Sequence, residues 1–202
     1  MSNSIADPKV TSSLSRAELH FRRIDMRGFQ RSDGLFEVEG RVTDSKTQEF
    51  VHPKPGRTVP AGEHIHDMGV RLVFDENMVV HDVQTFTDRA PYAACSEGGR
   101  ALQSIRGLRM AGGWSREVRS RLRGARSCTH LMEILIPMAT VAYQSLGFLR
   151  VTQPEKLDEK GRPLQIDSCY AYAGDGAVVL HRWPRFYRPL GLDEGEEISG
   201  ES

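Results

Sequence analysis

The sequence predicts an α+β domain in which an antiparallel sheet of hairpins packs against three helices. Two observations predict the sheet. Apolar and polar side chains alternate in residues 35–43 and again in 68–74, which is the period of a half-buried strand. Turn-forming residues, Arg31-Ser32-Asp33-Gly34 and Asp75-Glu76-Asn77, adjoin these stretches. A third observation predicts the helices, because apolar residues from 131 to 146 recur at steps of three and four.

The predicted strands form consecutive hairpins. In chain order, we expect strands at residues 19–29, 35–43, 68–74 and 78–86. Residues 44–62 hold three prolines and two glycines without a period, so we expect a loop there. Ser168–Ala173 and Ala177–Trp183 are interpreted as a final hairpin around Gly174-Asp175-Gly176.

Three helices are expected after the second hairpin. The first is predicted at residues 96–108, the second at 115–122, and the third from Cys128 to about residue 148. The third has an amphipathic face, and Pro137 within it is expected to bend it. We expect the three helices to cover one face of the sheet.

The length of 202 residues fits one domain with a proper core. We place this domain at residues 16–190. A polar, Ser-rich lead at 1–15 and an acidic, Gly-rich tail at 191–202 are expected to be disordered.

Charge and cysteine usage narrow the function classes. Lys+Arg and Asp+Glu number 27 each, so the net charge favours neither nucleic acid nor a membrane surface as a partner. No apolar run approaches the ~20 residues of a membrane span, and the N-terminus lacks the features of a secretory signal. Three cysteines do not make a disulfide framework. We therefore expect a cytoplasmic protein with reduced thiols, and the oligomeric state is left open.

Five side chains of metal-ligating type fall at the ends of predicted elements: His64, His66, Cys95, Cys128 and His130. His64 and His66 are expected on the same side of an extended strand, because side chains repeat there with period two. The return strand of this hairpin leads back toward them and on to Cys95. Zinc and iron take thiolate and imidazole ligands. The sequence therefore predicts a zinc or iron site built from these residues.

Cys128 also fits a second chemistry. At a helix N-terminus its thiolate is favoured by the backbone amides and the helix dipole, which suits a metal ligand and a nucleophile alike. As a nucleophile it would take His130 or His66 as its base. Asp67 is a candidate general base, or a partner to a metal-bound histidine.

Three arginines, Arg116, Arg119 and Arg123, share one face of the second predicted helix. Such a cluster can bind a phosphate, a carboxylate or a CoA tail, which makes a small anionic substrate a candidate partner. The other interpretation is a solvated basic face. No aromatic residues are interleaved with these arginines, so a nucleic-acid role is not indicated.

One resemblance lies in short motifs spread over most of residues 15–188. They resemble the hallmarks of a bacterial family known only as a domain of unknown function. The motifs are His66-Asp67-Met68, Ala90-Pro91-Tyr92 with Cys95, Gly113-Trp114 and Cys128-Thr129-His130-Leu131. This resemblance implies a family and no activity.

Residues 60–147 also resemble the NifU-type iron–sulfur scaffold family. In that family a Cys-Gly-Asp-x-Met segment leads into an alternating strand, and two further cysteines open later helices. Here His64-Ile65-His66-Asp67-Met68 takes the place of the first segment, and Cys95 and Cys128 take the places of the other cysteines. The resemblance implies an antiparallel sheet packed on helices. Because His64 replaces the first cysteine, it implies a mononuclear site of mixed histidine and cysteine instead of a cluster cradle.

These observations lead to one function and its alternatives. The leading hypothesis is a metal-binding protein that uses Cys95, Cys128 and His66, with His64 or His130 as a fourth ligand. As an enzyme, it would carry out metal-assisted hydrolysis or lyase chemistry on a small carboxylated or CoA-linked substrate. The alternatives are a non-enzymatic iron or sulfur scaffold or carrier, a metal-free cysteine-nucleophile enzyme, and a structural domain without site chemistry. The sequence leaves open whether the protein is an enzyme.

Overall fold

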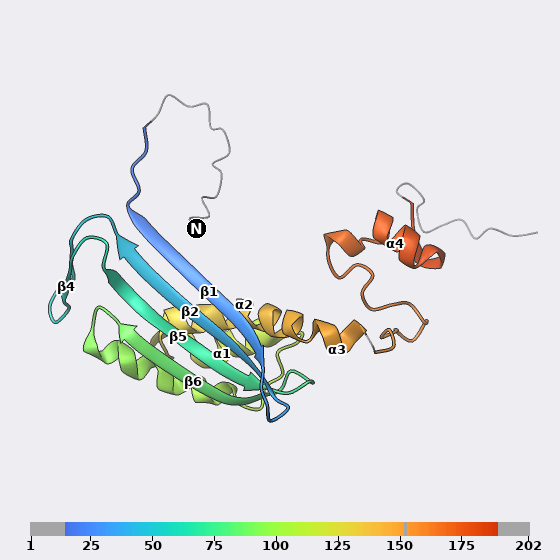
Figure 1. Ribbon diagram of the computed structural model, residues 1–202, viewed down its shortest axis with the longest axis horizontal. Coiled ribbons are helices and arrows are strands. Elements are labelled where there is room, and N and C mark those ends of the chain that lie inside the picture. The colour runs from blue at the N-terminus through green and yellow to red at the C-terminus, as the bar shows by residue number, and fades with distance from the viewer. Residues whose placement is uncertain (1–14, 152, 190–202) are drawn as a thin grey trace, which may run out of the picture. The chain divides into compact units, whose positions relative to one another are not determined.

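A computed structural model describes residues 15–151 and 153–189 (Figure 1). The contacts of the chain divide it into two compact units, with the boundary between Gly147 and Phe148. This division by contacts does not test the prediction of a single domain at residues 16–190, which stays a prediction. The predicted disordered lead up to residue 14 and the acidic tail from residue 191 lie outside the described residues.

The first unit is built on a four-stranded antiparallel sheet with the order β1-β2-β5-β6 (Figure 1). Its strands are β1 (His20–Gln30), β2 (Phe36–Lys46), β5 (His64–Phe74) and β6 (Val80–Arg89). Two hairpins, β1–β2 and β5–β6, are joined by the antiparallel pairing of β2 with β5. The predicted antiparallel sheet of hairpins is confirmed. The loop predicted at residues 44–62 contains a small extra ribbon of β3 (Phe50–Val51) and β4 (Thr58–Val59).

The strands separate an apolar face from a charged face. On β5, Met68, Val70 and Leu72 are fully buried, and Val38 and Val42 of β2 face the same side. The charged residues between them on β2 and β5 form ion pairs on the opposite face, including Arg71–Glu39 and Arg41–Asp67. The alternation seen in the sequence therefore corresponds to one face packed on helices and one face in contact with water.

Helices cover the apolar face. They are the 3-10 helix η1 (Ala93–Ile105), α1 (Trp114–Leu122), the short turn η2 (Gly124–Arg126) and α2 (Thr129–Ser145). Helix α2 lies across β1, β2 and β5, η1 lies against β6, and α1 packs on α2 and η1 (Figure 1). The indole of Trp114 donates a 2.9 Å hydrogen bond to the carbonyl of Leu135, which joins α1 to α2. The prediction of an α+β domain with helices on one face is confirmed.

Helix α2 is the apolar centre of this packing. Leu131, Leu135 and Met138 have no exposed surface. By length and composition, Thr129–Leu149 is the one helical run in the described residues that is apolar enough to cross a membrane. Core helices pass the same test, and the buried residues of α2 face the sheet. A cytoplasmic location stays a prediction.

The second unit contains short helices and no strand in its described residues. After α3 (Gly147–Val151), it comprises η3 (Tyr170–Tyr172), α4 (Ala177–Arg182) and η4 (Pro184–Phe186), with Ile166, Val179 and Trp183 as its small core. The predicted hairpin at Ser168–Ala173 and Ala177–Trp183 is therefore wrong. Gly176 leads directly into α4, where Leu180 N donates to Gly176 O and Trp183 N donates to Val179 O. An apolar run of this length does not distinguish a strand from a short helix by its period.

The pairing of β2 with β5 can be tested at Gly69. A Cβ atom there would overlap both the Gly40 carbonyl oxygen and the Phe86 ring, and the carbonyl belongs to the neighbouring strand and cannot rotate away. We expect Gly69→Ala to lower the free energy of unfolding by about 1–3 kcal/mol in chemical denaturation. The control is Gly112→Ala, since a Cβ at Gly112 meets nothing within 4 Å. Equal stability of the two variants would contradict this strand pairing.

Candidate metal centre

Three side chains of metal-ligating type meet at one end of the first unit. Asp44 lies near the end of β2, His66 near the start of β5, and His130 in the first turn of α2. One ligand atom from each lies within 4.8 Å of the other two. The pairing of β2 with β5 sets Asp44 opposite His66, and α2 brings His130 over them. We call these three residues the Asp44 group.

Asp44 is the centre of a hydrogen-bond network. Its side chain is 1% exposed and accepts two hydrogen bonds from Arg22, from Nε to Oδ1 at 2.7 Å and from Nη2 to Oδ2 at 2.9 Å. Nε2 of His20 lies 3.0 Å from Oδ1, and Nδ1 of His66 lies 3.0 Å from Oδ2. Charge-assisted, two-pronged bonds of this kind are among the strongest in proteins. They hold the carboxylate in one orientation.

The two imidazoles lie against each other. The ring centroids of His66 and His130 are 4.0 Å apart, and the ring planes are tilted by 39°. Nδ1 of His130 lies 3.9 Å from Sγ of Cys128, and this sulfur lies 3.6 Å from Sδ of Met68. A thiol therefore adjoins the Asp44 group, at the N-terminus of α2 as the sequence predicts.

Burial and charge set the protonation states of the group. Burial opposes ionisation of Asp44, but the hydrogen bonds and charge of Arg22 outweigh it, and the pKa of Asp44 falls to about 2. Burial and the neighbouring His130 lower the pKa of His66 to about 4, although Asp44 acts in the opposite direction. Burial and the charge of Arg22 also lower the pKa of His130. At neutral pH the group is one carboxylate and two neutral imidazoles, the protonation states that metal ligands need.

His64 does not join His66. Its Nδ1 lies 3.3 Å from Oδ2 of Asp67, while His66 bonds to Asp44. The expectation that both histidines share one side of the strand is wrong, because β5 carries an irregularity there. Ser45 pairs with His64 and Asp44 pairs with His66, so Ile65 is an extra residue between them. Such a bulge reverses the side on which the next side chain lies.

Asp67 lies with His64 and apart from the Asp44 group. Arg41 holds it with two hydrogen bonds, from Nε at 2.6 Å and from Nη2 at 2.7 Å, and these bonds lower the pKa of Asp67. The two residues line a separate hollow with Gly62, Glu63, Asp88 and Arg89. The predicted role of Asp67 as a general base stays a prediction. Among the described residues, Asp67 belongs to no cluster of three side chains that could hold a metal ion.

Cys95 lies in η1 and is half-buried. It is not among the ligand atoms of the Asp44 group. The segment η1 does approach Cys128, whose backbone N–H donates to the Gly98 carbonyl at 3.1 Å. Cys95, Cys128 and the exposed Cys169 are all free thiols, and a metal role for Cys95 stays a prediction.

The candidate ligand that the sequence did not indicate is Asp44. The predicted strand ends at Thr43, whereas β2 continues to Lys46, so the prediction places this carboxylate in a loop. A usable signal is present: Asp44 continues the buried phase of Val38, Gly40 and Val42. A carboxylate in that phase must have partners, because an unpaired buried charge is costly. Arg22 and His20 of β1 are those partners, and they too were missed.

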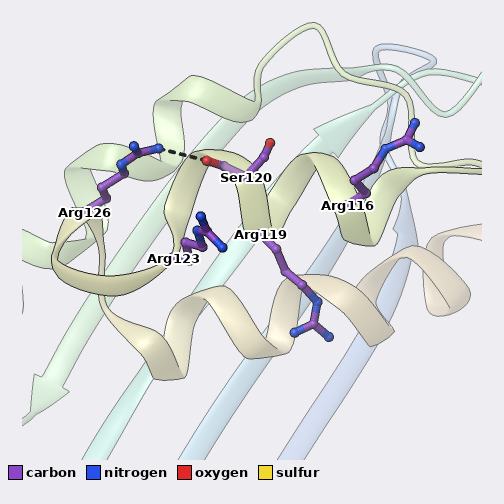
Figure 2. Close-up of a pocket in the computed structure, with 5 residues that line it drawn as sticks. All are labelled: Arg116, Arg119, Ser120, Arg123 and Arg126. Atoms are coloured by element: carbon purple, nitrogen blue, oxygen red, sulfur yellow. Dashed lines mark hydrogen bonds between the residues drawn. The ribbon is translucent and has the colours of Figure 1, made fainter.

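The predicted arginine face lies elsewhere. Figure 2 shows a hollow lined by Arg116, Arg119, Ser120, Arg123 and Arg126. Nη1 of Arg126 donates to the Ser120 carbonyl at 2.9 Å, and the other guanidinium groups point in different directions. No ion pair of Arg116, Arg119 or Arg123 is found within the described part of the chain. These arginines make no contact with the Asp44 group there, and their binding of an anion stays a prediction.

The fold and the site define a class: an α+β domain with a carboxylate and two histidines that can hold a metal ion. The chain belongs to the family described as "Protein of unknown function (DUF2889)", whose model matches residues 20–144. No similar protein was found among curated proteins or solved structures. The family match supports membership in an uncharacterised domain family. The likeness to the NifU-type scaffold family stays a prediction.

The lowered pKa values predict how the metal-free protein responds to acid. The folded pKa of His66, about 4, lies below the ordinary value of 6.5, so its contribution to stability is present above pH 6.5 and is lost as pH falls toward 4. The loss is at most about 3 kcal/mol. Asp44 adds a second loss between its ordinary value of 3.8 and about 2.

Urea unfolding with a chelator present, at a series of pH values, measures this loss. His66→Asn should reduce the slope of unfolding free energy between pH 6.5 and 4. His81→Asn serves as the control, because His81 is half exposed beside Asp75 and far along the sheet from the Asp44 group. An unchanged slope in His66→Asn would show that His66 is not held neutral by burial.

Proposed function

We propose that this protein binds one divalent transition metal, zinc or iron, through Asp44, His66 and His130. The observation that carries the proposal is the meeting of an ionised, buried carboxylate with two neutral imidazoles from three separate elements. Two histidines and one carboxylate form a ligand set that zinc hydrolases and non-haem iron enzymes use, with at least one coordination position open.

The distances between the ligand atoms of Asp44, His66 and His130 are compatible with a bound metal ion. Metal–ligand bonds of 2.0–2.2 Å set tetrahedral ligand atoms about 3.5 Å apart. The ligand atoms of the Asp44 group lie within 4.8 Å, so small side-chain rotations bring them into range. Cys128, whose Sγ lies 3.9 Å from Nδ1 of His130, is the nearest candidate for a fourth ligand. A thiolate there would favour zinc or iron over magnesium.

Arg22 competes with a metal ion for the carboxylate of Asp44. Its guanidinium engages both oxygens of Asp44, and its charge repels a cation at the same place. Glu133 offers an alternative partner, since Nη1 of Arg22 lies 3.8 Å from its Oε2. We infer that Arg22 neutralises Asp44 in the metal-free protein and turns toward Glu133 when a metal binds.

The reaction we propose is metal-assisted hydrolysis or lyase chemistry on a small carboxylated substrate. A bound metal would supply a water molecule of lowered pKa or a polarised carbonyl. Arg22, released from Asp44, would bind the substrate carboxylate near the metal. A CoA-linked substrate would need the arginines of α1 as well. Our proposal gives Asp67 no step in this chemistry, because Arg41 occupies it in the other hollow.

A second candidate is metal-free chemistry with Cys128 as nucleophile. The 3.9 Å approach of Cys128 Sγ to Nδ1 of His130 favours it, because nucleophile and base lie close to hydrogen-bonding distance. An iron–sulfur scaffold is less favoured, since no thiol is among the three ligand atoms that lie within 4.8 Å of one another.

Metal content tests the proposal directly. Protein purified without added metal should contain close to one zinc or iron per chain by elemental analysis. His66→Ala, His130→Ala and Asp44→Asn should each lose most of it, while His81→Ala, a histidine paired with Asp75 on another strand end, should keep it. A content well below one metal per chain, or a content that the three substitutions leave unchanged, would refute the proposal.

Arg22→Met tests the inferred competition. Without metal, the variant leaves a buried carboxylate short of its main partner, so the melting temperature should fall. With metal, the repulsion is gone, and zinc affinity should rise at least about tenfold. Thermal unfolding with chelator and with zinc measures both effects. Arg31→Met is the matched control, because Arg31 lies just after β1 and pairs with Asp33 instead. A variant that binds zinc more weakly than the natural protein would contradict the inference.

A further inference from the structure

Strand β1 leaves one edge of the sheet open. It is 11 residues long and pairs with β2 on one side only within the described chain. Its other side presents backbone N–H and C=O groups that another strand can pair with. Such an edge is commonly protected by a proline, an irregularity or charged side chains. β1 contains no proline and no irregularity, and its charged residues Arg22, Arg23, Asp25 and Arg27 are of both signs.

Large apolar side chains gather along this open edge. Leu19, just before β1, is 70% exposed, and Phe21, Ile24 and Phe29 within it are 52%, 48% and 42% exposed. Leu19, Phe21 and Phe29 lie in the same phase of the strand, on the face away from the helices, together with Arg23, Asp25 and Arg27. The row is therefore apolar at its two ends and charged in the middle.

The side chains of this row complement those of a second β1 strand that runs antiparallel to it. In an antiparallel pair of two β1 strands centred on Ile24, Leu19 lies opposite Phe29 of the second copy, and Phe21 lies opposite Arg27 of the second copy. Arg23 lies opposite Asp25 of the second copy, and two-fold symmetry repeats each pair. The result is two apolar pairs, two cation–π pairs and two ion pairs across one interface.

Other registers fit less well. Centred on Asp25, the pairing sets Asp25 against itself and Arg23 against Arg27, which places like charges opposite each other. Centred on Met26, it still pairs Asp25 with Arg27, but it leaves Leu19 without an apolar partner and sets Ile24 against Gly28. Only the register centred on Ile24 pairs both the charges and the apolar side chains.

We propose that two copies of this protein associate through β1, antiparallel and centred on Ile24, into one continuous eight-stranded sheet. The proposal is independent of metal binding. It also places the second copy beside the Asp44 group, because His20, which bonds Asp44, lies opposite Gly28 of the second copy. The partner is a second copy because the edge complements its own sequence.

Sedimentation equilibrium on the full chain tests this association. The natural protein should have about twice the chain mass of 22.6 kDa. Ile24→Lys should reduce it to the chain mass, since it sets two like charges face to face at the two-fold axis. Leu157→Lys, at an exposed apolar residue of the second unit, should leave the dimer intact. A monomeric natural protein, or a dimer that survives Ile24→Lys, would overturn the proposal.

A charge exchange tests the register. Arg23→Asp alone should weaken the dimer, and adding Asp25→Arg should restore it, because the ion pairs are then remade with reversed sign. In the register centred on Met26, the Asp25→Arg side chain would face Arg27 of the second copy, and the double variant would stay monomeric. Circular dichroism and melting temperature establish that each variant is folded. A folded double variant that stays monomeric would refute the register centred on Ile24.

Discussion

The buried carboxylate of Asp44 is the constraint on which one end of this fold depends. A charge in a dry environment costs several kcal/mol unless hydrogen bonds and opposite charge offset it. Here the compensation comes from Arg22 and His20 on β1 and from His66 on β5. The starts of β1 and β5 and the end of β2 must therefore lie side by side in the correct register. His130, at the start of α2, lies beside the same carboxylate. The surroundings of one ionised group therefore include both the sheet and the helix layer.

Charged side chains are distributed differently on the two faces of the sheet. On the outer face, the ion pair Arg71–Glu39 is partly exposed and adds little stability. Asp67 is buried there, and two hydrogen bonds from Arg41 offset the cost of burying its charge. On the inner face, charge is confined to one end, and the rest is apolar. The extra residue Ile65 decides which face receives which histidine: His66 turns inward to Asp44 and His64 outward to Asp67. A single-residue irregularity thus separates two polar clusters.

Much of the fold could be predicted, and part of the site. The alternation of Phe36, Val38 and Val42 marks a strand, and the spacing of Leu131, Leu135 and Met138 marks a helix, because each pattern depends only on local geometry. His66, His130 and Cys128 were recognised as candidates by residue type. Asp44 was not, because the predicted strand ends at Thr43 and β2 continues to Lys46. The apolar run at Ala177–Trp183 was misread, since short helices and strands share that composition.

The sequence by itself determined the order of the four long strands and the helices of the first unit, the buried face of β2 and of α2, and the placing of Cys128 and His130 at a helix start. These follow from periodicity, turn residues and chain direction. Only the tertiary structure decided that Asp44 joins His66 and His130, that His64 turns away with Asp67, and that Arg22 occupies the carboxylate. The contacts of Asp44 join residues 22 to 86 positions apart, and the separation of His64 from His66 depends on a bulge whose position no local pattern encodes.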